Sequence, residues 1–89
     1  MSRMPELSRF YGLVVQRYVR DHAPPHFHVA YGEHEAIVDF QRGVVIAGSL
    51  PMRARAMALD WAALHQTELL EAWELAVGGQ LPGKIEPLL

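Results

Sequence analysis

Cysteine is absent from the sequence, which excludes disulfide bonds and metal sites built from thiolates. Long apolar runs are absent as well, and no stretch approaches the roughly 18 residues that a membrane-spanning helix needs. The N-terminus carries Arg3, Pro5, Glu6 and Ser8 and lacks the apolar core of a signal peptide. We therefore expect a cytoplasmic protein that does not enter a membrane.

A strong net charge is also lacking, because eight basic residues stand against ten acidic ones, which gives a net charge of −2. This balance provides no bulk attraction to nucleic acid or to anionic lipid. The charges are nevertheless unevenly distributed, since residues 1–20 hold four arginines and residues 56–77 hold four carboxylates without any Lys or Arg. Opposite charges at the two ends of the chain favour contact with another protein.

The length of 89 residues, with 51% hydrophobic and 20% charged residues, fits a single globular domain over residues 1–89. We expect residues 1–8 to be frayed. Four segments rich in β-branched and aromatic residues follow and predict strands: residues 10–19, 26–31, 35–40 and 44–48. The connections are too short for parallel crossovers, so residues 10–48 should form an antiparallel meander. Gly12, inside the first segment, indicates a bulge or a close approach.

A helix is predicted over residues 50–78, because Ser49-Leu50-Pro51 is typical of a helix start and Gly78-Gly79 of a helix end. Residues 80–89 should form an extended tail. At about 1.5 Å per residue such a helix is roughly 40 Å long and exceeds a strand of about 20 Å. It therefore either kinks near Gln66-Thr67 or extends past the sheet. The predicted fold is α+β: a four-stranded antiparallel β-meander followed by one long α-helix packed on one face.

An extended helix would present an apolar surface to another chain, and we predict an interface at Leu69, Leu70 and Trp73. The partner would be a small protein or a second copy in a homodimer. The alternative is that Trp61 and Trp73 belong to the core of so small a domain.

Three of the five histidines lie within Asp21–Val29. His26 and His28 are two apart on a predicted strand and share one face, and His22 could turn over them from the stiff Pro24-Pro25 corner. Three imidazoles can bind a divalent transition metal, with Asp39 from the next strand as a further ligand or as a base. The same residues could instead act as acid and base without metal, or could form a hydrogen-bonded polar face.

Arg53 and Arg55 stand in the first turns of the predicted helix, where positive charge opposes the helix dipole. Two arginines at a helix N-terminus could bind a phosphate, a nucleic-acid backbone or an acidic patch of a partner. Ordinary solvated charges are the alternative. The sequence shows no recognition-helix signature, so nucleic-acid binding lacks support.

Several motifs resemble one bacterial family. They are Ser8-Arg9-Phe10-Tyr11-Gly12, the block His22-x-Pro24-Pro25-His26-Phe27-His28, Leu50-Pro51-x-Arg53-Ala54, Trp61-x-x-Leu64-His65 and Glu68-Leu69-Leu70-x-x-Trp73. Together they resemble the small family called domain of unknown function 4160. The resemblance implies an intracellular protein, often encoded beside a second small protein in a toxin–antitoxin-like unit. It implies no activity or cofactor.

Two functions follow as expectations. The first is a small interaction module of such a two-gene unit. The alternative is a metal-dependent hydrolase or nuclease that uses His22, His26 and His28, with Arg53 and Arg55 holding a phosphate.

Overall fold

The computed structural model describes residues 5–17 and 23–89 and contains five strands followed by two helices. The strands are β1 (Glu6–Phe10), β2 (Leu13–Gln16), β3 (Phe27–Tyr31), β4 (His34–Asp39) and β5 (Val44–Gly48), and the helices are α1 (Met52–Leu64) and α2 (Gln66–Val77). The strands form one antiparallel sheet in sequence order. The predicted α+β class and antiparallel meander are confirmed, whereas the predicted four strands and one helix are wrong.

The additional strand comes from a hairpin inside the segment that we predicted as one strand. Tyr11 and Gly12 have φ of 47° and 85°, and positive φ at both central residues is what a tight two-residue hairpin requires. The chain therefore reverses at Gly12, and Phe10 pairs with Leu13. Gly12 is a turn residue rather than a bulge, and Glu6–Ser8, predicted to be frayed, belong to β1.

The predicted long helix is broken at His65, whose φ of −120° lies outside the helical range. The break lies one residue before the kink considered near Gln66-Thr67. The Gln66 side chain donates a hydrogen bond of 3.0 Å to the Phe40 carbonyl, which fixes the start of α2 to the end of β4. Among the residues that the structure describes, no helix is both long and apolar enough to cross a membrane.

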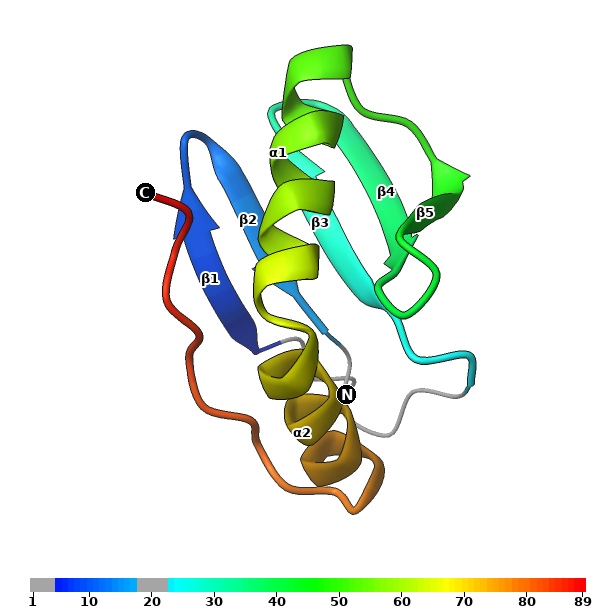
Figure 1. Cartoon of the computed structure of the whole chain (residues 1–89), viewed down its shortest axis with the longest axis vertical. Coiled ribbons are helices and arrows are strands. Elements are labelled where there is room, and N and C mark those ends of the chain that lie inside the picture. The colour runs from blue at the N-terminus through cyan, green and yellow to red at the C-terminus, as the bar shows by residue number, and fades with distance from the viewer. Residues whose placement is uncertain (1–4, 18–22) are drawn as a thin grey trace.

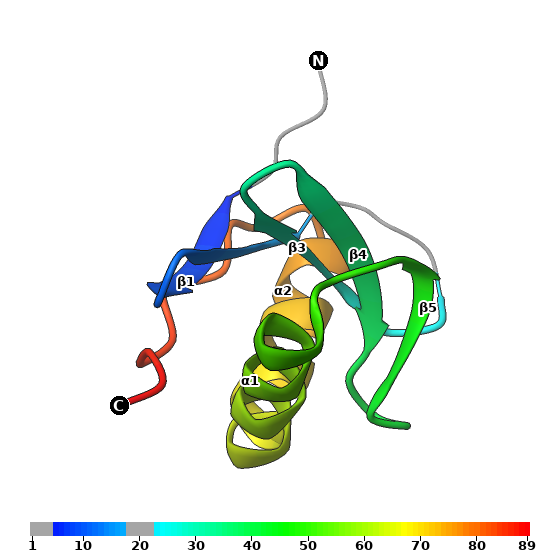
Figure 2. The ribbon, with the colours of Figure 1, turned by 90° about the horizontal axis from the view of Figure 1, so that it is seen from above.

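Both helices cover one face of the sheet (Figure 1). Seen from above, the sheet curves around α1, with β1 and β5 at its two sides (Figure 2). The core between the layers contains Leu13, Val15, Phe27, Val29 and Val38 from the sheet and Trp61 from α1. Strand register places His28, Ala30, Glu35 and Ile37 on the other side, which we name the open face. Helices therefore cover only one face of the described sheet.

The C-terminal residues run alongside β1 (Figure 1). The Ile85 amide donates to the Leu7 carbonyl at 2.7 Å, and Trp61 Nε1 donates to the Glu86 carbonyl at 2.8 Å. Ile85 is buried. The tail thus covers the β1 edge of the sheet.

Candidate functional site

The first candidate site lies where β3 begins. The His26 ring is buried and stands 5.3 Å from the His28 ring, measured between centroids. His26 Nδ1 lies 2.6 Å from the Pro24 carbonyl, which can only accept a hydrogen bond. Nδ1 therefore carries a hydrogen and donates it to this carbonyl.

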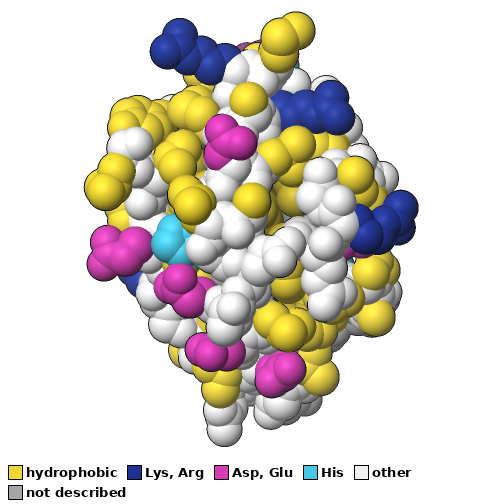
Figure 3. Space-filling model, in the orientation of Figure 1, with side chains coloured by type: hydrophobic (Ala, Val, Ile, Leu, Met, Phe, Trp, Pro, Cys, Tyr) yellow, Lys and Arg dark blue, Asp and Glu magenta, His cyan; other side chains and the backbone are white. Residues whose placement is uncertain are grey.

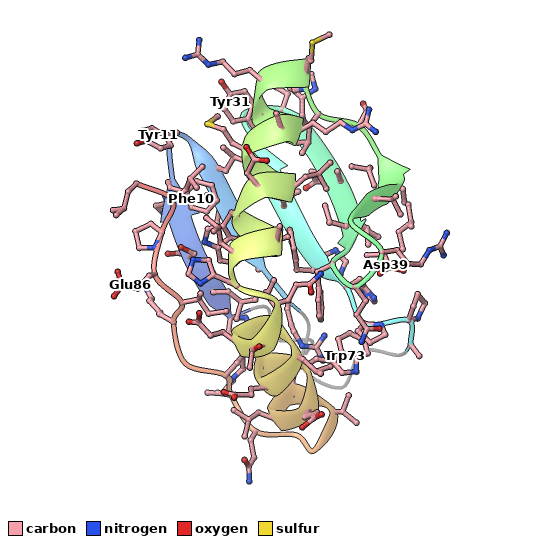
Figure 4. The ribbon with its side chains drawn as sticks, in the orientation of Figure 1. Phe10, Tyr11, Tyr31, Asp39, Trp73 and Glu86 are labelled. Atoms are coloured by element: carbon pink, nitrogen blue, oxygen red, sulfur yellow. The ribbon has the colours of Figure 1, made fainter. Side chains whose placement is uncertain are left out.

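Trp73 of α2 closes this site from the helix side. Its ring lies 5.2 Å from the His26 ring, and the Arg17 guanidinium carbon lies 4.0 Å from the Trp73 ring centroid. Arg17 is buried, so its charge meets the face of the indole out of water. Figure 4 shows Trp73 near the lower end of the sheet. The break at His65 gives α2 its own direction and places Trp73 here.

A hollow of about 300 Å³ lies beside His28 on the open face. Its polar lining includes Gln16, His28 and Glu35, and its apolar lining includes Ile37 and Ala47. The register accounts for this set, because Gln16 pairs with His28, His28 with Ile37 and Ile37 with Ala47 across four strands. His28 and Glu35 therefore share the open face.

The predicted metal ligands are brought together only in part. His22 lies outside the described residues. Within residues 5–17 and 23–89, no group of three or more His, Cys, Asp or Glu side chains could hold a metal ion. A metal bound by His26 and His28 would need a ligand from elsewhere, and the metal site stays a prediction.

Asp39 lies at the end of β4 and is almost completely buried (Figure 4). Its Oδ1 accepts hydrogen bonds from the amides of Gln41 and Arg42 at 3.1 and 2.9 Å. Its Oδ2 lies 3.8 Å from the Arg42 guanidinium. Among the described residues Asp39 forms no hydrogen bond with a histidine, and its visible role is to hold the turn between β4 and β5.

The predicted anion-binding residues lie far from the histidines. Arg53 and Arg55 are exposed at the start of α1, whose N-terminal end lies at the top of Figure 1, opposite α2. His65 lies twelve positions after Arg53, which corresponds to about 18 Å of helix. Phosphate held by these arginines would not reach His26 or His28.

The three predicted interface residues lie in different surroundings. Leu69 and Trp73 are buried in the core of their own chain, and Leu70 is 36% exposed. Trp61 is fully buried. Leu70 alone of the three remains at the surface for a partner.

A second candidate site is the β5 edge of the sheet. β5 pairs with β4 on one side, and no described strand pairs with its other side. Its sequence Val44-Val45-Ile46-Ala47-Gly48 carries no charge, and Val44 and Ile46 are 36% and 42% exposed. Exposed apolar edge strands are typical places for another strand to bind.

Arg17 and the β5 edge were not predicted as site features. Leu13, Val15 and Arg17 are all buried and alternate along the chain. In the sequence, Arg17 therefore stands at a position where the alternation predicts a core residue, and this could have indicated a buried cation. The apolar run of residues 44–48 was visible, but its position at the edge depends on the number of strands before it.

The fold places the chain among small α+β proteins in which two helices cover one face of a five-stranded antiparallel sheet. Residues 12–74 match the family described as Domain of unknown function (DUF4160), and the chain belongs to this family. The match confirms the resemblance and includes the block His22–His28. No curated protein and no solved structure matches the chain.

Proposed function

We propose that this protein is a small interaction module that acts by binding a protein partner. The partner would be the product of a neighbouring gene, as in toxin–antitoxin-like two-gene units, and both proteins would act inside a bacterial cell. The observation that supports this function is the uncovered β5 edge with its exposed Val44 and Ile46.

The contrast between the two edges of the sheet strengthens the proposal. The chain covers β1 with its own tail through the bond from Ile85 to Leu7, whereas no described strand pairs with the outer side of β5. Soluble proteins usually protect an edge strand with charged side chains, proline or a covering segment. β5 has neither charge nor proline, and its one irregularity is the register shift at Ile46, so its exposed Val44 and Ile46 support a partner at this edge.

The test is a titration of the purified protein with the product of the adjacent gene. We expect a complex of defined mass in light scattering and a dissociation constant in the micromolar range or tighter, as is usual for specific protein interfaces. A protein that stays monomeric and releases no heat on mixing would contradict the proposal. If the protein alone forms a homodimer, its partner is a second copy of the chain, which is the other partner predicted from the sequence.

The pair His26 and His28 supports a second candidate function, a metal-assisted or acid–base hydrolase. The two imidazole rings lie 5.3 Å apart, His26 Nδ1 donates to the Pro24 carbonyl, and His28 lines the open-face hollow, so a metal or a substrate bound there would meet an imidazole. The third ligand would be His22, as predicted from the sequence. Because Arg53 and Arg55 lie far away, substrate would be bound without them.

Metal content and activity test this candidate. Mass spectrometry of tag-free protein should show a stoichiometric divalent metal that is lost in His28→Ala and kept in His34→Ala, since His34 is an exposed residue at the start of β4. A metal-free parent protein that shows no hydrolase or nuclease activity would leave the histidines as a structural hydrogen-bonded pair.

A further inference from the structure

We infer that β5 binds an extended, acidic segment of the protein partner, which joins the sheet as a sixth strand. The inference rests on the proposed function and names the class of partner surface. It follows from three features of the β5 edge: its free backbone groups, its basic surroundings and the hollow beside it.

The backbone of β5 provides the first feature. In an antiparallel sheet every second residue of an edge strand directs its N–H and C=O groups away from the sheet. β5 is the last strand of the described sheet, so these groups point toward solvent. An extended segment can satisfy them through main-chain hydrogen bonds, and such bonds depend little on the sequence of the segment.

Positive charge around β5 provides the second feature. Arg42 precedes β5 with its side chain 71% exposed, and the exposed Arg53 and Arg55 follow it at the start of α1. Neither Arg53 nor Arg55 forms an ion pair with another described residue. In Figure 3 most Lys and Arg side chains lie along the top and right, over the start of α1 and the side where β5 lies, and most Asp and Glu side chains lie at the left and bottom, with one acidic side chain at the upper centre over α1. Arg42 lies 3.8 Å from Asp39 and the exposed Glu35 lies beside Gly48, so the three arginines outnumber these two carboxylates around β5 and favour an acidic occupant.

The same charges disfavour a second copy of this chain as the occupant. In an antiparallel pairing of two β5 strands, Arg42 of one copy would lie beside the end of β5 in the other copy, close to Arg53 and Arg55. This arrangement repeats at both ends of a twofold interface and places like charges together twice. Like charges at an interface cost binding energy and exclude partners. An acidic segment meets the same arginines favourably.

The hollow on the open face provides the third feature. Ala47 and Gly48 form its β5 side, and Ile37 of β4 contributes to its lining. A strand added to β5 would place every second side chain on this face beside Ala47. An apolar side chain of moderate size, such as Val or Ile, fits this place. The expected segment therefore alternates apolar residues and carries Asp or Glu at both ends.

The test uses three synthetic peptides with the same alternating Thr-Val core. One is flanked by Asp and Glu, one by Lys, and one has the acidic flanks but an N-methylated backbone. The readout is amide hydrogen exchange and NMR shift changes of the whole protein. We expect the acidic peptide to slow the exchange of β5 amides and to bind at least about tenfold more tightly than the Lys peptide. The N-methylated peptide should not protect β5.

The variant Arg42→Glu/Arg53→Glu should reduce the affinity for the acidic peptide by about tenfold or more. Lys84→Glu is the control, because Lys84 lies on the tail beside β1 and pairs with Glu6 at 3.4 Å. Equal binding of the acidic and Lys peptides, protection of another element, or no binding would overturn the inference. Protection of β5 that grows with protein concentration in the absence of peptide would overturn it in favour of a second copy.

Failure of the inference and failure of the proposed function give different results. If the neighbouring gene product binds while the β5 amides exchange as in the free protein, the interaction module stands and the sixth strand does not. If the acidic peptide protects β5 while the neighbouring product does not bind, the sixth strand stands and the two-gene partnership does not.

Discussion

Asp39 shows how one carboxylate can resemble a metal ligand in the sequence and act as a turn residue in the structure. In the sequence, the alternation of polar and apolar residues places Asp39 on the same predicted face as His26 and His28. The register pairs Phe27 with Val38 and His28 with Ile37, and the same count places Asp39 level with His26, where β3 has not yet begun. Alternation predicts which face a side chain occupies, but the amides of Gln41 and Arg42 determine which partner it binds.

Asp39→Ala should lower the free energy of unfolding, because it leaves two amides of the turn without their acceptor. We expect a loss of about 2–3 kcal/mol. Asp39→Asn keeps a side-chain oxygen at this place and should cost about 1 kcal/mol or less. Urea unfolding followed by circular dichroism measures both. Equal losses for the two variants would show that the charge of Asp39, rather than its oxygen, is needed.

At the scale of elements, the last three strands were predicted to within one residue, because alternation and glycine turns mark them clearly. The first strand was not, since Tyr11 lies inside a β-branched and aromatic run and is a rare residue at positive φ. The helix break was predicted only as one of two alternatives, a kink near Gln66-Thr67, and the structure places it at His65. Contacts of Gln66 with Phe40 and of Trp73 with His26 and Arg17 direct α2, and these depend on tertiary structure.

Gly48 at the end of β5 has a φ of 71° and pairs with Ala36 of β4. A Cβ there would lie 2.1 Å from the Glu35 carbonyl oxygen, whereas a Cβ at Gly43, with a φ of 68°, meets nothing within 4 Å. Gly43→Ala should therefore cost about 1 kcal/mol from the backbone conformation alone. Gly48→Ala should lower the free energy of unfolding by at least about 3 kcal/mol, because the backbone of Glu35 or of Gly48 must move to make room for the Cβ. Thermal unfolding separates them, and similar losses for the two variants would contradict the close approach.

The tail is an element of the core even though it contains no helix or strand. Glu6 of β1 binds Arg9 at 2.8 Å and Lys84 of the tail at 3.4 Å. The hydrogen bond from Arg9 lowers the pKa of Glu6, with Lys84 as a smaller cause in the same direction. These exposed ion pairs therefore contribute to the free energy of unfolding at neutral pH. This small contribution is lost as the pH falls through the lowered pKa of Glu6. The main attachment is apolar, through Ile85.

Ile85→Ala should destabilise the protein by about 2 kcal/mol or more, because it opens a cavity beside β1. Leu89 provides the matched control, since it is fully exposed at 101% and Leu89→Ala should change stability by less than about 0.5 kcal/mol. Chemical denaturation of both variants gives the difference. If Ile85→Ala behaves like Leu89→Ala, the tail does not contribute to the core.

At the scale of the whole molecule, the structure shows where the unevenly distributed charges of the sequence lie on the surface. Most Asp and Glu side chains lie at the left and bottom of Figure 3, and most Lys and Arg side chains lie at its top and right. The sequence alone could not place Arg42 beside this group, because the turn before β5 and the start of α1 are brought to one edge only by the fold. The separation of Arg53 and Arg55 from the histidines likewise appears only in the assembled chain.

This arrangement predicts that one charge reversal converts a monomer into a dimer. If repulsion between Arg42 and the arginines of a second copy keeps two β5 edges apart, Arg42→Glu should permit pairing, because each new carboxylate would face Arg53 and Arg55 of the other copy. The triple variant Arg42→Glu/Arg53→Glu/Arg55→Glu restores like charges and should be monomeric again. Sedimentation equilibrium at low salt measures both, and the Arg42→Glu dimer should dissociate as salt screens the exposed charges. Dimers of the parent protein and of all variants alike would show that these arginines do not control which partner reaches β5.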